Sequence, residues 1–272
     1  MNSPTPQSLR AVVFDLDDTL AESKSTMDPT MADALARLLD RVDVCIISGG
    51  RFEQFESQAL NGFTASDESL RRLHLMPTCG TRYYLWDGTN WALQYAEDLT
   101  EDEKSRSIAA LEEGAKALEL WHPGEWGDII EDRGSQITFS ALGQRAPVAA
   151  KVAWDPDGAK KRVLWEYVAP RLPDLEVRGG GSTSIDITRK GIDKAYGIDK
   201  LTNRIGAGLD ELVFIGDRLD VTGNDYPVYA LGVTSVPVHD WRDTLAAVEA
   251  LVSWLDAGNG EFPLAALEPL PR

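Results

Sequence analysis

The sequence predicts an α/β fold in which a doubly wound parallel sheet carries a smaller inserted α+β domain. Near both ends of the chain, short apolar runs alternate with amphipathic helical segments, which is typical of parallel strands joined by helical crossovers. Polar residues directly follow several of these runs, at the edge where open α/β sheets bind ligands. The middle of the chain instead has paired strand-like segments and two helices. We expect the parallel-sheet domain at residues 1–81 and 188–272 and the inserted domain at residues 82–187.

The parallel-sheet domain is expected to begin with a strand at residues 11–14, which are apolar and rich in β-branched and aromatic side chains. Apolar residues at helical spacing predict a helix at residues 29–40, and a second apolar run predicts a strand at residues 42–47. This order of strand, helix and strand indicates a parallel sheet. The remaining elements expected in this domain are a helix at 52–60, a helix that follows residues 190–194 and ends at 201, strands at 212–215, 229–233 and 235–238, and a helix at 240–255.

The inserted domain is expected to open with a hairpin, because two aromatic-rich segments, 81–86 and 91–95, flank an Asp-Gly-Thr-Asn turn. A capping box of Thr100 and Glu103 predicts the start of an amphipathic helix at residues 100–120. The other elements expected here are strands at 129–132, 136–142, 175–178 and 182–187 and a helix at 155–168. Strand pairs that alternate with helices predict a compact antiparallel sheet with helices on one face.

Composition and charge argue against nucleic acid as a partner, a disulfide framework and a membrane-spanning segment. The 272 residues carry a formal net charge of −17, which disfavours nucleic acid as a partner because binding to its phosphates requires Lys and Arg. An anionic ligand would need a local basic cluster or a metal ion. Two cysteines provide no disulfide framework, and no apolar stretch is long enough to cross a membrane. Residues 1–10 lack the apolar core of a signal peptide, so the expected location is the cytoplasm.

The first motif is a pair of carboxylates, Asp15 and Asp17, directly after the first expected strand. Two acids that lie close together repel each other, so the pair requires a metal ion or a shared proton if both face one cleft. The alternative is a structural one, in which this segment forms an Asx-type turn and a helix cap.

Ser48, Gly49, Gly50 and Arg51 follow the second expected strand. The glycines would let backbone N–H groups approach an anion at the start of the next helix, although an ordinary β-to-α turn would have the same sequence. Polar residues after a later strand, at Asp217, Asn224 and Asp225, add oxygen ligands of the kind Mg²⁺ prefers. Lys194 is either a fixed cation for the same site or a surface lysine at the start of a helix.

Residues 14–20 resemble the first motif of the haloacid dehalogenase (HAD) superfamily, Asp-x-Asp-x-Thr, and the inserted section resembles its type IIB cap. The resemblance implies a Rossmann-like HAD core and phosphoryl transfer. Asp15 would be the nucleophile and Asp17 the general acid/base, Ser48 would hydrogen-bond the phosphoryl group, and Lys194 would screen its charge. The Mg²⁺ site implied by the resemblance comprises Asp15, Asp17 through its backbone carbonyl, Asp217, Asn224 and Asp225.

Four stretches are similar to the α-phosphomannomutase subfamily. These are Gly49-Gly50 with Phe52-Glu53, the segment 77–80, the segment 180–186 and the extended loop 216–225. The resemblance implies that Gly49, Gly50 and Arg51 bind substrate beside the nucleophile, that Arg133, Arg145 and Arg178 bind its distal phosphate, and that Ser184 and Asp186 bind the sugar. It also implies a hexose 1,6-bisphosphate activator and a homodimer formed through the cap. The chain departs from the subfamily at Asp18, where the mutases usually have Gly, and at Ser48, which is phosphatase-like.

The expected function is therefore Mg²⁺-dependent phosphoryl transfer on hexose phosphates, which interconverts mannose or glucose 1-phosphate and 6-phosphate through an aspartyl-phosphate. A sugar-phosphate phosphatase is the alternative, since it differs only in letting water reach the same intermediate. A non-catalytic sugar-phosphate sensor is a third reading, which the retained nucleophile disfavours. The sequence leaves mutase and phosphatase open.

Overall fold

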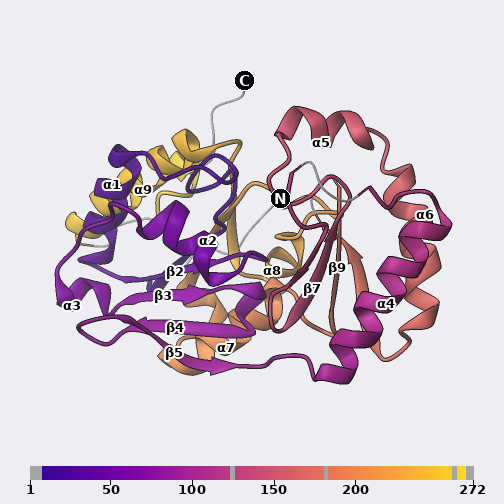
Figure 1. The fold of residues 1–272 in the computed structure, drawn as a ribbon. Coiled ribbons are helices and arrows are strands. Elements are labelled where there is room, and N and C mark those ends of the chain that lie inside the picture. The colour runs from indigo at the N-terminus through magenta and orange to yellow at the C-terminus, as the bar shows by residue number, and fades with distance from the viewer. Residues whose placement is uncertain (1–7, 123–125, 181–182, 259–261, 268–272) are drawn as a thin grey trace. The chain divides into compact units, whose positions relative to one another are not determined.

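The computed structural model describes residues 8–122, 126–180, 183–258 and 262–267, which divide into two compact units (Figure 1). The first unit lies within residues 1–95 and 193–272, and the second within residues 96–192. Residues 1–7 of the N-terminal segment and Gly181 and Ser182 of the 180–186 motif lie outside the described residues.

The first unit is built on a seven-stranded sheet with the order β11-β10-β1-β2-β3-β4-β5. Its strands are β1 (Ala11–Phe14), β2 (Asp43–Ile47), β3 (Leu73–Met76), β4 (Arg82–Trp86), β5 (Trp91–Ala96), β10 (Leu212–Gly216) and β11 (Thr234–Pro237). The five strands from β11 to β3 pair in parallel, and β4 runs antiparallel to β3. In the centre, Val13 of β1 lies opposite Cys45 and Phe214, so the carboxyl ends of β1, β2 and β10 meet at one edge.

Alternate residues of these strands pack into two separate cores, one on each face of the sheet. Val12 and Phe14 lie in a cluster with side chains of α1 (Pro29–Leu39) and α9 (Trp241–Asp256). Ala11 and Val13 lie in a second cluster with α7 (Lys194–Ile205) and α8 (Tyr226–Ala230). Since successive strand residues point to opposite faces, the fully apolar strands are explained by this double burial. The predicted doubly wound α/β fold is confirmed.

Capping residues define the ends of the major helices of this unit. Asp28 caps α1 by accepting a hydrogen bond from the Thr30 N–H at 2.9 Å, and Pro29 occupies the first turn. Asp193 caps α7 by accepting from the Tyr196 N–H at 3.1 Å, and Gly206, with φ of 67°, ends that helix. Asp240 caps α9 in the same way.

The second unit is a four-stranded antiparallel sheet with the order β6-β7-β9-β8. Its elements are α4 (Glu101–Ala117), β6 (Ile130–Asp132), β7 (Gln136–Ser140), α5 (Val148–Trp154), α6 (Ala159–Val168), β8 (Leu175–Gly179) and β9 (Ser184–Arg189). One face of the sheet packs against α4 and α6 through a cluster that includes Ile137, Phe139 and Leu164. The intervening strand residues are polar and form the other face.

Some expected elements differ from the structure. The hairpin β4–β5 belongs to the seven-stranded sheet, so the second unit begins after Tyr95 rather than at residue 82. The strand expected at 229–233 is replaced by α8, because Pro227 lies in the first turn of a short helix and a short apolar run is ambiguous between the two structures. The sequence analysis did not identify α3 (Asp67–Leu70), β3 or α5. No helix among the described residues is long and apolar enough to span a membrane.

Candidate active site

Lys194 lies between two carboxylates at the carboxyl edge of the seven-stranded sheet. Its Nζ is 2.5 Å from Asp15 Oδ1 and 2.5 Å from Asp225 Oδ1. Asp15 directly follows β1 and donates its backbone N–H to Ile215 of β10 at 3.0 Å. Lys194 and Asp225 are fully buried, and Asp15 is buried as well. A buried lysine is retained only with charged partners, so the surface interpretation of Lys194 is wrong.

Two glycines, Gly197 and Gly80, allow the close packing that places Lys194 between the two carboxylates. A Cβ on Gly197, in the first turn of α7, would lie 2.3 Å from Ile47 Cδ1 and 2.8 Å from the Cys79 carbonyl oxygen. A Cβ on Gly80 would lie 2.6 Å from the Gly197 Cα, and Gly80 has φ of +83°. The start of α7 therefore packs directly on the segment 78–80, which is part of the Pro-Thr-Cys-Gly motif at residues 77–80.

The extended loop after β10 supplies two more carboxylates, Asp217 and Asp225. Asp225 Oδ2 accepts the Arg218 N–H at 3.0 Å, and the Asp225 N–H donates to the Arg218 carbonyl at 3.2 Å. A Cβ on Gly216 would lie 2.4 Å from Asp225 Oδ2, and a Cβ on Gly223 would lie 1.9 Å from the Arg218 carbonyl oxygen. Both glycines are thus required for the loop to turn Asp225 back onto the sheet edge.

Oxygen ligands of Asp15, Asp217 and Asp225 all lie within 4.8 Å of one another, which makes this cluster a candidate metal site. Burial and the neighbouring Asp225 raise the pKa of Asp217 to about 6. Burial also raises the pKa of Asp15, an effect that Lys194 opposes and Asp225 reinforces. Three carboxylates face a single ammonium, and a divalent cation with a preference for oxygen would relieve their repulsion. The residues present therefore fit Mg²⁺.

Asp17 is held apart from this cluster by donors from the helical segment after β2. Its Oδ2 accepts from Gln54 Nε2 at 2.7 Å, and its Oδ1 accepts from Gln58 Nε2 at 3.2 Å and from the Lys24 N–H at 3.1 Å. Asn224 is exposed, and the Asp17 side chain is not part of the acidic cluster found among the described residues. Neither glutamine was predicted from the sequence, although their spacing of four residues in an expected helix places them on one face.

The loop Ser48 to Arg51 is internally bonded. Ser48 Oγ is buried and accepts the Gly50 N–H at 3.1 Å, while the Ser48 carbonyl accepts the Cys79 N–H at 2.9 Å. A Cβ on Gly49 would meet nothing within 4 Å, so the packing around this position does not itself require a glycine. Arg51 is exposed, stands at the N-cap of α2 (Phe52–Phe55) and pairs with Glu53 at 3.4 Å.

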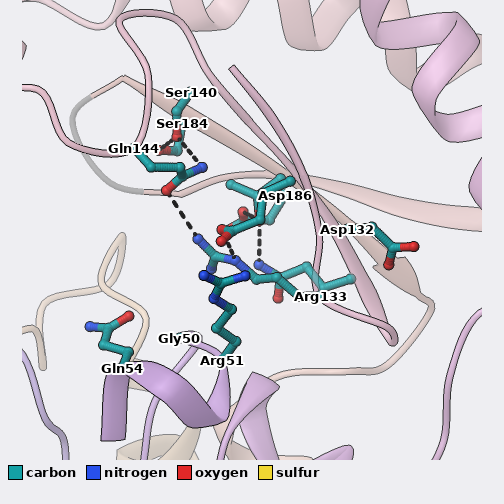
Figure 2. A network of polar contacts seen from close by, with 12 residues as sticks. Gly50, Arg51, Gln54, Asp132, Arg133, Ser140, Gln144, Ser184 and Asp186 are labelled. Atoms are coloured by element: carbon teal, nitrogen blue, oxygen red, sulfur yellow. Dashed lines mark hydrogen bonds and ion pairs between the residues drawn. The ribbon is translucent and has the colours of Figure 1, made fainter. Parts of the chain in front are cut away.

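A polar network covers one face of the second unit (Figure 2). Arg133 pairs with Glu131 at 2.6 Å and donates to Gln144 Oε1 at 3.4 Å. Gln144 Nε2 donates to Ser140 Oγ at 3.1 Å, which in turn lies 3.1 Å from Ser184 Oγ.

Asp186 belongs to the same face. It accepts from Thr138 Oγ1 at 2.7 Å and lies opposite Thr138 and Arg178 in the sheet register. Burial raises the pKa of the Asp186 carboxyl, and the positive charge of Arg133 opposes that shift. Arg133, Arg178, Ser184 and Asp186 are therefore brought to one surface, together with Thr138 and Ser140, which the sequence analysis missed although they alternate with apolar residues.

The other two predicted arginines have different surroundings. Arg178 pairs with Glu176 at 3.5 Å and donates to the Ile192 carbonyl at 3.2 Å. Arg145 is exposed, and its guanidinium lies beside Gly127, where a Cβ would be 3.4 Å away. No ion pair to Arg145 is found among the described residues, which leaves its charge available to an anion.

Comparisons with known proteins identify the family of the chain. The family model of eukaryotic phosphomannomutases matches residues 31–253. Phosphomannomutase 1 of Mus musculus is 24% identical over 224 residues, which cover 80% of this chain and 82% of the relative. The phosphomannomutase of Encephalitozoon cuniculi is 25% identical over 257 residues, which cover 92% of this chain and 96% of the relative.

Solved structures share the fold at lower identity. The ATP-bound IMP-nucleotidase of Plasmodium falciparum has a TM-score of 0.68 and 16% identity, covering 94% of this chain and 63% of that one. A trehalose-6-phosphate phosphatase related protein has a TM-score of 0.56 and 14% identity, covering 89% and 97% respectively. The chain therefore belongs to the eukaryotic phosphomannomutase family and is an enzyme of the HAD superfamily.

Proposed function

We propose that the protein transfers phosphoryl groups between positions of a hexose phosphate, with Asp15 as the nucleophile. The observation that carries the proposal is the arrangement of the two motif carboxylates. Asp15 is buried against Lys194 at 2.5 Å, within the acidic cluster, whereas Asp17 is held by amide donors outside it. This difference in surroundings suits one carboxylate for attack on phosphorus and the other for proton transfer. Family membership supports the mutase over the phosphatase.

The proposed reaction has two phosphoryl-transfer steps. Phosphorylated Asp15 gives its phosphoryl group to the 6-hydroxyl of a hexose 1-phosphate, and Asp17 accepts the proton of that hydroxyl. The hexose 1,6-bisphosphate then reorients. Asp15 attacks the phosphorus at position 1, the bond from that phosphorus to the sugar oxygen breaks, and Asp17 returns the proton to the oxygen. Hexose 6-phosphate leaves, and Asp15 is phosphorylated again.

The carboxylates of Asp15, Asp217 and Asp225 would hold Mg²⁺. Asn224 and the Asp17 backbone carbonyl are proposed as further oxygen ligands. When bound, the cation supplies positive charge that neutralises the transferring phosphoryl oxygens. Lys194 supplies a fixed charge of the same sign, and its contact with Asp15 and Asp225 orients the nucleophile. Ser48, Gly49 and Gly50 are proposed to contact the phosphoryl group.

We propose that the second unit acts as the cap and that its polar face binds the substrate's distal phosphate and sugar. Arg145, Arg133 and Arg178 would bind the phosphate, with Arg51 of the first unit also assigned to the substrate. Arg145 is the best candidate for binding the phosphate, because Arg133 and Arg178 already pair with glutamates. Ser184 and Asp186 would bind the sugar hydroxyls.

Dimerisation through the cap stays a prediction, which light scattering would check.

The deciding experiment supplies mannose 1-phosphate and Mg²⁺ with and without hexose 1,6-bisphosphate, and follows hexose 6-phosphate and free phosphate together. We expect hexose 6-phosphate to form, with a rate that depends on the bisphosphate. Free phosphate alone would identify a phosphatase with the same nucleophile. If neither product forms in excess Mg²⁺, then the protein does not act on this substrate class and the proposal is wrong.

A further inference from the structure

Two glutamine side chains donate hydrogen bonds to the carboxylate of Asp17. Gln54 Nε2 donates to Asp17 Oδ2 at 2.7 Å, and Gln58 Nε2 donates to Asp17 Oδ1 at 3.2 Å. Each carboxylate oxygen thus receives a side-chain amide, and the Lys24 backbone N–H adds a third donor at 3.1 Å. All of these groups lie in the first unit.

The local backbone is shaped for these contacts. The helix after Arg51 changes from α to π geometry at Glu56–Leu60, and the Asn61 N–H donates to the Glu56 carbonyl at 2.8 Å. A π turn inside a helix is rare and often accompanies a functional site. It carries Gln58, whose side chain is 1% exposed although glutamine is ordinarily a surface residue.

Beyond the Asp17 carboxylate, the two amides have different surroundings. A Cβ on Gly50 would lie 2.2 Å from Gln54 Oε1, so Gly50 leaves the space that the Gln54 amide occupies. Gln58 Oε1 is buried and has no hydrogen-bond partner among the described residues. The buried Gln58 amide therefore makes its one useful contact by donating to Asp17, at the cost of an unsatisfied oxygen.

We propose that Gln54 and Gln58 are positioning residues that aim Asp17 at the sugar oxygen, an inference that rests on the proposed role of Asp17 as proton carrier. The amides act on Asp17 and do not touch the reacting phosphorus. Their loss lets the carboxylate rotate about χ1 and χ2, which lowers the rate of proton delivery but not the affinity for substrate. A leaving group that departs without a proton does not require the Asp17 carboxylate to be oriented in this way.

The experiment compares two phosphoryl donors in single turnovers that phosphorylate Asp15. Hexose 1,6-bisphosphate has an alkoxide leaving group that requires a proton, and p-nitrophenyl phosphate has a phenolate that does not. For Gln54→Met and Gln58→Met we expect the limiting rate with the bisphosphate to fall about 10- to 100-fold, and the rate with the aryl phosphate to stay within about twofold. The half-saturating concentration of either donor should also stay within about twofold, because the glutamines do not bind substrate.

Gln94→Met is the matched control, since Gln94 is an exposed glutamine of the same unit. Gln54 is half-buried, so its variant tests the proposal even if Gln58→Met fails to fold. Equal losses on both donors would show that the glutamines are merely structural, and unchanged rates on both would show that they do not aim Asp17. Either result overturns the inference.

Asp17→Asn separates this inference from the proposed function. If Asp17→Asn slows the bisphosphate reaction selectively and the glutamine variants do not, then only the positioning role is wrong. If Asp17→Asn itself slows both donors equally, then Asp17 is not the proton carrier, and the proposed function loses that assignment together with the inference.

Discussion

The close approach of α7 to the segment 78–80 can be tested by adding one methyl group at Gly197. An alanine Cβ there would lie 2.3 Å from Ile47 Cδ1 and 2.8 Å from the Cys79 carbonyl oxygen. Ile47 is a fully buried residue at the end of β2, and the Cys79 carbonyl is backbone, so neither neighbour has room to retreat without moving its element. We therefore expect Gly197→Ala to push the start of α7 outward.

Two effects of opposite sign decide the change in stability. Alanine is better than glycine inside a helix by ~1 kcal/mol, which favours the variant. Overpacking a close-packed site costs about 1–3 kcal/mol, and a contact as short as 2.3 Å belongs near the upper end of that range. The net expectation is a loss of ~1–2 kcal/mol in the free energy of unfolding, which corresponds to a fall of about 2–8 °C in Tm for a chain of this size.

The same displacement is expected to lower activity, because Lys194 lies three residues before Gly197 and contacts Asp15 at 2.5 Å. Small misplacements of a charged group beside a nucleophile are costly, so we expect kcat to fall about tenfold or more with KM little changed. Calorimetry gives Tm, and the coupled mutase assay gives kcat. Asn203→Ala, at an exposed position on the same helix, is the control that gains helix propensity without a clash.

A variant Gly197→Ala that is more stable than the wild type, as helix propensity alone would predict, would contradict the close approach. So would a variant that is destabilised yet fully active, because the displacement of α7 would then not reach Lys194. A displacement of α7 at Gly197 is expected to lower stability and activity together.

Three further predictions concern single side chains. Asp15→Asn should reduce phosphoryl transfer at least about 10³-fold while Tm stays near the wild-type value, and appreciable turnover by a folded variant would exclude the covalent route. Arg145→Ala should raise KM for hexose phosphates about tenfold but leave KM for an aryl phosphate unchanged, with exposed Arg162→Ala as the charge-matched control; equal changes on both substrates would remove Arg145 from the distal phosphate site. Burial, assisted by Arg204 and Arg10, lowers the pKa of His74 from 6.5 to about 4, so the unfolded chain takes up this proton before the folded one does. Stability should therefore decline as pH falls from about 6.5 toward 4, by ~3 kcal/mol from this group, and His74→Gln but not exposed His122→Gln should flatten the pH dependence of Tm.

The parts of the fold that follow from periodicity were predictable from the sequence. The strand Ala11–Phe14 and the helix Pro29–Leu39 agree with their expected ranges because apolar spacing and the cap Asp28 act locally. The helix Glu101–Ala117 likewise begins at the predicted cap Thr100. The hairpin β4–β5 was recognised as a hairpin but placed in the wrong unit. Its assignment depends on which strand it pairs with, and pairing over long separations leaves no local signal.

The candidate site, too, was only partly predictable from the sequence. Asp15, Asp217 and Asp225 could be grouped from the sequence because each follows the end of a parallel strand, and such ends meet at one edge. Gln54 and Gln58 were missed, because their helix looks like an ordinary amphipathic one until Asp17 is placed beside it. Buried polar contacts are set by tertiary packing, which periodicity does not report.

The departure at Asp18, where the related mutases usually have glycine, is explained by the backbone at that position. Asp18 has φ of 58°, in the left-handed region that glycine enters freely and aspartate tolerates better than most residues. Its N–H donates to the Ala21 carbonyl at 2.7 Å, and its carboxylate accepts the Ser23 N–H at 3.1 Å, so the side chain supports the same turn. Asp18 therefore occupies a left-handed position that a glycine could adopt equally well. Asp18 is compatible with the turn that follows Asp15 and Asp17, and it gives no reason to favour hydrolysis over transfer to a sugar.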